Sequence, residues 1–154
     1  MTPEQTAALQ ALAGREFTAG EMAALGRLTV DRNDVLIERI LSAGRTKRGM
    51  VMRPRFVTWA ARTGMRAVIE DHSANQQSPL RSIALGLRDV VTGAADGIDF
   101  AWGENVTMLS LWIAAGYLTQ TAADELLAIA EHPDPVGVPA VSLALNNLAG
   151  LITL

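Results

Sequence analysis

Two short stretches of this sequence gather most of the side chains that could carry out chemistry. In the first, Glu70, Asp71 and His72 are consecutive, and two carboxylates beside an imidazole can bind a metal ion or transfer protons. Neighbouring side chains on a helix point in different directions, however, so these three do not converge on one atom. We interpret them as the polar end of a helix and predict no catalytic site there.

The second stretch is a loop that contains Asp96, Asp99 and Glu104. Its spacing resembles part of a calcium-binding loop, but the full pattern of alternating acidic ligands, a central glycine and a final glutamate is missing. We therefore expect no calcium site and no other metal site in this chain.

Enzyme motifs are absent from the rest of the sequence. There is no cysteine, which excludes a thiol nucleophile and a cysteine-ligated metal, and the only histidines, His72 and His132, lie far apart. The sequence has no Gly-x-x-x-x-Gly-Lys-Ser/Thr loop, no Gly-x-Gly-x-x-Gly and no Gly-x-Ser-x-Gly. We expect a protein that is not an enzyme and that uses no cofactor.

The elements that would position these residues are predicted to be helices. Residues 2–5 and 18–21 both have the Thr-x-x-Gln/Glu pattern of a capping box, in which two side chains satisfy the first backbone N–H groups of a helix. The longest helix is predicted from Pro54 to about His72, with Gly64 inside it marking a close contact, and the last helix begins at Pro139. The fold class that follows is all-α, a compact bundle of seven or eight short helices.

The length of the chain predicts its domain organisation. With 154 residues, 49% of them hydrophobic and 19% charged, the sequence is too apolar for a disordered protein and long enough for one domain. We expect a single helical domain over residues 1–154, in which the polar run 73–78 is the only stretch that resembles a linker. Residues 45–53 depart from the helical pattern and form a possible extended arm.

The charged residues are segregated along the sequence. Residues 1–88 hold all 13 basic residues and 8 acidic ones, whereas residues 89–154 hold 8 acidic residues and no basic one. Such asymmetry indicates a charged partner, and three explanations stay open. The basic stretch binds phosphates, it binds the acidic half of a neighbouring copy, or it is neutralised within the same fold, which is slightly favoured.

Two surfaces are predicted to bind partners. The first is the basic segment, with the side chains of Arg45, Lys47, Arg48, Arg53 and Arg55. The second is one face of the uncharged C-terminal helix, formed by Val141, Leu145, Leu148 and Ile152. Together with the apolar stretch 108–113, this helix gives more apolar surface than short helices in a small domain usually bury, which indicates a protein partner or self-association.

Nucleic-acid binding is the alternative. Two short helices between residues 18 and 44 resemble a helix–turn–helix, but the second carries Asp31, Asp34 and Glu38, which would repel phosphates. Phe56 and Trp59 can stack on bases, although their helical spacing favours packing in the core.

The longest apolar run, about 11 residues, is too short for a bilayer that needs roughly 20, and the first residues lack the features of an export signal, so we expect no membrane partner.

Four stretches of the sequence carry a family resemblance: Ser42-Ala43-Gly44-Arg45-Thr46-Lys47, Leu118-Thr119 followed by Glu125-Leu126-Leu127-Ala128, Pro133-Asp134-Pro135-Val136, and Ala140-Val141-Ser142-Leu143-Ala144-Leu145-Asn146. They resemble small all-helical proteins of unassigned function that are encoded in the late, tail-region gene clusters of tailed bacteriophages and prophages. The resemblance spans most of residues 30–147 and consists of helix caps and turns. It implies a virion protein made in the host cytoplasm, and it brings no catalytic motif.

The chain departs from this family between Arg48 and Thr63, where relatives more often carry an aliphatic run that contains glycine. Here the segment includes Met50-Val51-Met52-Arg53-Pro54-Arg55-Phe56. The resulting prediction is a non-enzymatic tail or baseplate component that contacts other phage structural proteins or copies of itself. The alternative is a small intracellular phage protein that binds nucleic acid or inhibits a host defence enzyme.

Overall fold

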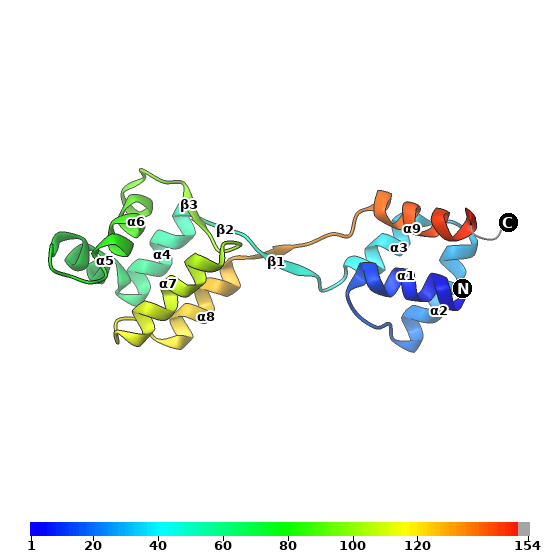
Figure 1. Ribbon diagram of the computed structural model, residues 1–154, viewed down its shortest axis with the longest axis horizontal. Helices are drawn as coiled ribbons and strands as arrows, with labels where there is room; N and C mark the ends of the chain where they lie inside the picture. The colour runs from blue at the N-terminus through cyan, green and yellow to red at the C-terminus, as the bar shows by residue number, and fades with distance from the viewer. Residues whose placement is uncertain (151–154) are drawn as a thin grey trace. The chain divides into compact units, whose positions relative to one another are not determined.

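The computed structural model describes residues 1–150, which form nine helices and four strands of three residues each (Figure 1). The predicted helical character is confirmed, but the strands show that the fold is not strictly all-α. In place of the single domain expected from the chain length, the residues group into two units. Unit 1 contains residues 1–46 and the chain from Pro133 onwards, and unit 2, Lys47–His132, is inserted between them.

Unit 1 is built from helices that come from both ends of the chain: α1 Pro3–Ala13, α2 Ala19–Val30, α3 Asp34–Ser42 and α9 Val138–Gly150. The starts of α1 and α2 follow directly from local sequence. Thr2 and Thr18 each accept a hydrogen bond from the backbone N–H three residues later, and the side chains of Gln5 and Glu21 bind back to the N–H of the cap. Both predicted capping boxes are therefore confirmed.

The start of α3 depends on a cap residue in the turn that follows α2. Asn33 is the cap, and its side-chain oxygen accepts the N–H of Leu36 at 3.2 Å. Thr29 is not free for this role because it is buried within α2, where its hydroxyl donates to the carbonyl of Leu25 at 2.8 Å.

The core of unit 1 joins the N-terminal helices to α9. Its fully buried side chains are Leu9, Leu25, Ile37, Leu41 and Val141, with Leu145 3% exposed. Since α9 packs against both α1 and α3, the last helix completes a core that α1, α2 and α3 begin.

Unit 2 contains the remaining helices and two of the strands. These are β2 Met50–Met52, α4 Arg53–Thr63, α5 Met65–Ala74, α6 Arg81–Thr92, β3 Gly97–Asp99, α7 Gly103–Ala114 and α8 Gln120–Ile129. The other two strands are β1 Thr46–Arg48 and β4 Glu131–Pro133, which pair with each other. The chain passes from one unit to the other within these two strands.

The single helix predicted from Pro54 to about His72 is divided into α4 and α5. Gly64 separates them with a φ of 78°, in the left-handed region that favours glycine. The expected close contact is not the reason for this glycine, because a Cβ there would meet no atom within 4 Å. The backbone conformation explains the residue.

The polar run 73–78 does not separate domains. Ser73 is buried in the last turn of α5, and the following residues form the turn that leads to α6, inside unit 2.

The predicted interpretation of Phe56 and Trp59 as core residues is confirmed, because they are 1% and 2% exposed and the Trp59 Nε1–H donates to the carbonyl of Ala122 at 2.9 Å. Other large buried side chains of this core are Trp112, Phe100 and Leu126.

Within the predicted arm 45–53, residues 46–48 and 50–52 are strands, Arg53 already begins α4, and the two strands belong to separate ribbons. β1 pairs with β4, whereas β2 pairs antiparallel with β3, with Met50 opposite Asp99 and Val51 opposite Ile98. Val51 is buried, and the flanking methionines are exposed. The segment therefore builds part of unit 2 and is not a free arm.

Candidate interaction surfaces

Arg45, the first residue of the predicted basic surface, holds unit 1 together. Its guanidinium donates to the carbonyl of Leu12 at 2.7 Å and to the backbone carbonyl of Asp134 at 3.1 Å, and it pairs with the Asp134 carboxylate at 2.9 Å. It thereby ties the end of α1 to the segment that returns toward α9. A guanidinium with three such partners is a structural group, because a new ligand would have to displace them.

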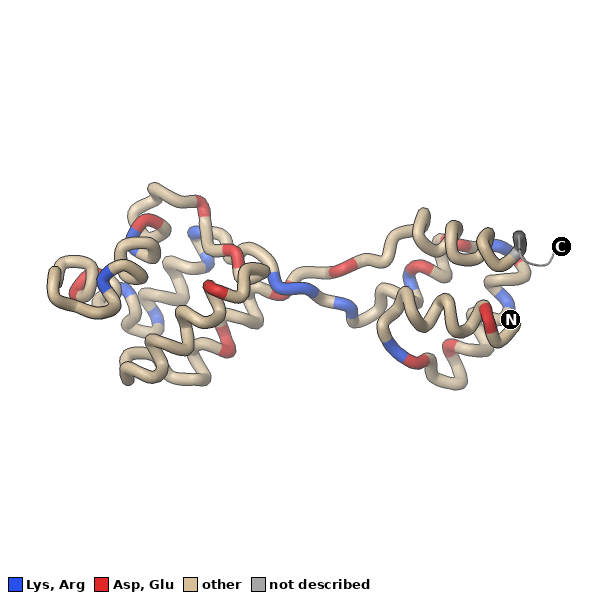
Figure 2. Tube along the Cα trace, in the orientation of Figure 1, with Lys and Arg blue, Asp and Glu red and all other residues tan. Residues whose placement is uncertain are grey.

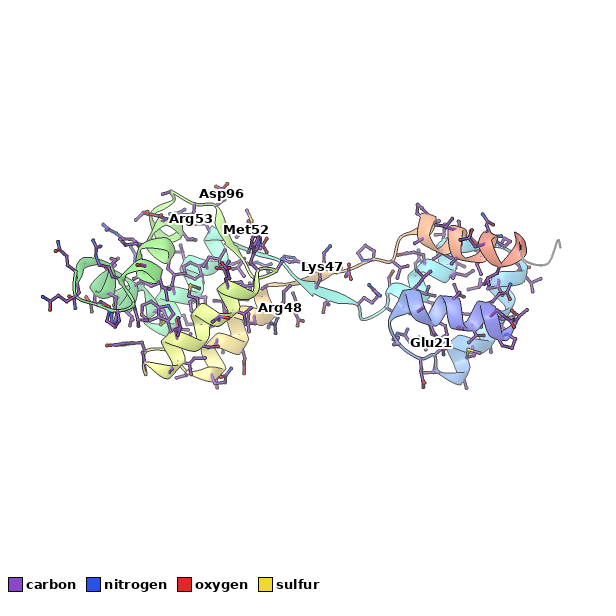
Figure 3. All side chains as sticks on the ribbon, viewed as in Figure 1. Glu21, Lys47, Arg48, Met52, Arg53 and Asp96 are labelled. Carbon is purple, nitrogen blue, oxygen red and sulfur yellow. The ribbon has the colours of Figure 1, made fainter. Side chains whose placement is uncertain are left out.

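Arg53 has a structural role in unit 2. Its side chain donates to the carbonyls of Val90 and Val91, each at 3.1 Å, and its backbone N–H donates to the carbonyl of Asp96 at 2.7 Å. The positive charge thus lies at the C-terminal end of α6, where the helix dipole and unpaired carbonyls favour a cation. Figure 3 shows Arg53, Met52 and Asp96 at the same end of unit 2.

The other three basic residues predicted to bind partners are exposed. Lys47 and Arg48 lie on β1 (Figure 3), and Arg55 lies on α4 beside a cavity of about 400 Å³ between α4 and the end of α8. The five side chains therefore do not form one free surface, because those of Arg45 and Arg53 donate hydrogen bonds to carbonyls of their own units.

Charges of both signs are distributed over each unit (Figure 2). Unit 1 has 5 basic and 7 acidic residues, a net charge of −2, and unit 2 has 8 basic and 9 acidic residues, a net charge of −1. Arg45 pairs with Asp134, and Arg62 pairs with Glu125 at 2.6 Å, so basic residues from the first half of the chain meet acidic residues from the second. This favours the explanation that the segregated charges are neutralised within the fold.

The predicted apolar face of the C-terminal helix is mostly occupied by its own unit. Val141 and Leu145 are buried against α1 and α3, and Leu148 is half-buried. Ile152 lies outside the described residues. The burial of Val141 and Leu145 does not fit the expectation that this face is presented to another subunit; the exposed apolar residue of α9 is Leu143.

Two of the side chains that could carry out chemistry, those of Glu70 and His72, have structural partners. Glu70 pairs with Arg66 at 3.4 Å, and His72 Nδ1 lies 2.5 Å from the Ser78 hydroxyl at the turn before α6. The His72 ring also contacts the edges of Trp112 and Tyr117, at centroid distances of 5.3 and 4.4 Å. Within residues 1–150 no three His, Asp or Glu side chains are placed to hold a metal ion.

Unit 2 has a groove between α6 and α7, with a volume of about 650 Å³. This volume falls within the range of roughly 300–1,000 Å³ that is common for ligand-binding clefts. β3 contributes Gly97 and Ile98 to the lining. The other apolar side chains of the groove are Ile83, Leu87, Val90, Ala95, Met108 and Leu111.

The polar lining of this groove contains carboxylates but no basic side chain. Asp89 lies on α6 and Glu104 on α7, and both are exposed. Neither carboxylate has a hydrogen-bond or ion-pair partner among the described residues. The groove is therefore an apolar channel with unpaired negative charge on both of its helices.

Methionine side chains enlarge the apolar surface beside Gly97. A Cβ at Gly97 would lie 2.3 Å from the carbonyl of Val51 and 3.1 Å from Met50 Cγ, so only glycine allows β2 to approach this closely. Met50 and Met52 are 41% and 51% exposed, and Leu111 is 46% exposed. Because side chains alternate between the two faces of a strand, the methionines lie on the face of the ribbon opposite to Val51 and Ile98, and they form an exposed apolar patch separate from the groove lining.

Sequence reasoning found this surface only in part. The apolar stretch 108–113 was expected to exceed what the fold buries, and Met108 and Leu111 from it line the groove. The opposite wall was missed, because Ile83, Leu87 and Val90 have the spacing of an ordinary core-facing helix. No sequence signal shows that part of such a face lies in an open groove.

Comparison with known proteins matched the chain to no family model, to no curated protein and to no solved structure. None of the helices in the described part of the chain is both long and apolar enough to cross a bilayer.

Proposed function

We propose that this chain is a non-enzymatic component of a bacteriophage tail or baseplate that acts by binding another protein through the groove of unit 2. The observation that carries the binding role is the open, apolar channel between α6 and α7, which is lined in part by the exposed side chain of Leu111. An apolar surface of this kind on a protein exposed to water is stabilised when a partner covers it. The phage context rests on the sequence resemblance.

The predicted alternative, nucleic-acid binding by the basic segment, has less support. Arg45 and Arg53 donate to backbone carbonyls inside their own units, so they are not available for phosphates. A binding site that kept only Lys47, Arg48 and Arg55 would make few phosphate contacts, and duplex DNA affinity rises with the number of such contacts.

Purified virions from the strain that encodes the chain provide the test. We expect the wild-type chain in the particles, and we expect Leu111→Glu to be lost from them, because it places a charge on the apolar wall without disturbing the core. Leu143→Glu is the matched control, since Leu143 is 61% exposed on α9 in unit 1. Absence of the wild-type chain from particles, or equal incorporation of both variants, would argue against the proposal.

A further inference from the structure

We infer that the partner segment held in the groove of unit 2 is a cationic amphipathic helix of another protein. This inference rests on the proposed function and specifies the chemistry of the partner. Three features of the groove support it: the two helices that form its walls, the flexible apolar side chains along it, and the sign of its unpaired charges.

The walls fit a helix better than an extended peptide. An extended peptide binds mainly by adding a strand to a free sheet edge. Most of the groove is lined by side chains of the helices α6 and α7, and β3 contributes only Gly97 and Ile98 to it. A helix instead inserts side chains spaced i, i+3, i+4 and i+7 between two walls of this kind. Ile83 and Leu87 on one side and Met108 and Leu111 on the other offer such anchors an apolar surface.

The methionine in the groove favours an adaptable helix site. Met108 lines the groove, whereas Met50 and Met52 lie outside its lining, on the face of the β2–β3 ribbon opposite to Ile98. Unbranched methionine side chains adjust to partner side chains of different shape, which makes them common at surfaces that bind helices.

The charges determine the sign of the partner. Asp89 and Glu104 come from opposite walls, both are exposed, and neither is paired among residues 1–150. Since no basic side chain lines the groove, a partner helix with Lys or Arg beside its apolar face would gain favourable contacts with both walls. An acidic helix would meet repulsion from the same two carboxylates.

Binding of two designed peptide pools to the full-length chain tests this inference. The members of the first pool share lysines beside an apolar face whose residues vary among Leu, Ile, Met and Phe, and the second pool has glutamate in place of each lysine. We expect the lysine pool to bind at least tenfold more tightly by fluorescence anisotropy, with an affinity that falls as salt is added. Amide NMR shift changes are expected on α6, β3 and α7.

Charge variants connect this preference to the groove. Asp89→Asn together with Glu104→Gln is expected to weaken binding of the lysine pool several-fold, because each lost exposed pair contributes modestly. Asp71→Asn together with Glu131→Gln removes the same charge from exposed positions outside the groove, and it is expected to leave binding unchanged. The inference is overturned if no lysine peptide binds, if both pools bind equally, or if the two double variants weaken binding equally.

These outcomes are separable from those of the proposed function. If Leu111→Glu is lost from virions while the peptide pools show no preference for lysine, the groove binds a partner of different chemistry. In that case the proposed function stands and the cationic helix is rejected.

Discussion

Glu21 is the residue whose ionisation is most strongly affected by folding. Its carboxylate accepts a hydrogen bond from the Arg15 guanidinium at 2.6 Å and another from the backbone N–H of Thr18 at 2.8 Å. These contacts stabilise the charged form and lower the pKa of Glu21 from 4.5 to about 2, with the Arg15 contact the largest cause. Because the pKa is lower in the folded state, the stabilisation is complete above pH 4.5 and is lost as the pH falls toward 2.

A single substitution tests this contribution. Glu21→Gln is expected to lower the stability of unit 1 at pH 7 and to flatten its dependence on pH between about 4.5 and 2, as followed by far-UV circular dichroism during thermal unfolding. All three tryptophans, Trp59, Trp102 and Trp112, lie in unit 2, so tryptophan fluorescence serves as an internal control that does not change. An unaltered pH profile in the variant would contradict the assignment.

Local chemistry explains which of these contacts the sequence reveals. The bond between Thr18 and Glu21 spans three residues, and its pattern predicts it directly. The second role of Glu21, its pair with Arg15, depends on the turn between α1 and α2 and has no sequence pattern. The same limit applies to Arg45 and Arg53, whose spacing predicts a charged surface although their partners lie 33 to 89 residues away.

At the scale of elements, the end of α6 depends on a side chain from α4. α6 is capped at its C-terminal end by Gly93, which has a φ of 89°. The helix has no basic residue of its own in its last turn. Arg53 supplies the missing cation to the carbonyls of Val90 and Val91. A residue expected to contact partners therefore stabilises a helix that forms one wall of the groove.

Arg53→Ala is expected to destabilise unit 2 by about 1–3 kcal/mol, because it removes charged hydrogen bonds to helix-end carbonyls. Urea unfolding followed by tryptophan fluorescence measures the loss in unit 2 alone. Arg55→Ala removes the same kind of side chain two residues along, where it has no hydrogen-bond partner among the described residues, and is expected to change stability by no more than about 0.5 kcal/mol. Equal losses in both variants would refute the structural role of Arg53.

Helix starts were predicted better than helix ends and breaks. The threonine caps at residues 2 and 18 are confirmed because a cap needs only the next few residues. The break at Gly64 was missed because glycine also occurs within helices, and only the backbone angle separates α4 from α5. The pairing of β2 with β3 joins residues about 50 positions apart, which a pattern of alternation does not specify.

At the scale of the whole chain, the insertion of unit 2 was not predictable from composition. No polar linker marks its boundaries, since the chain passes between the units through β1 and β4, and the one polar run lies inside unit 2. The ends of unit 2 lie side by side: the N–H of Gly49 donates to the carbonyl of Ala130 at 2.9 Å, and His132 contacts the carbonyl of Met50. A unit with its own core and adjacent ends is typical of an independently folding domain.

The fragment of residues 47–132 is therefore expected to fold alone. It should unfold in one cooperative transition in urea, with the same midpoint by tryptophan fluorescence and by circular dichroism. The full-length chain, followed by fluorescence, serves as the reference for that midpoint. A broad transition without a folded baseline would show that unit 2 needs unit 1 to fold.

The interrupted order of unit 1 has a consequence for its synthesis on the ribosome. α3 ends at Ser42 and α9 begins at Val138, and translation adds roughly 5–20 residues per second. The ribosome therefore needs about 5–20 s after synthesis of the first three helices to reach the segment that brings Val141 and Leu145 into contact with Leu9 and Leu25. Unit 2, by contrast, is made as one continuous stretch. The inserted unit is the first to be complete as the polypeptide emerges, and the N-terminal helices acquire their final partner last.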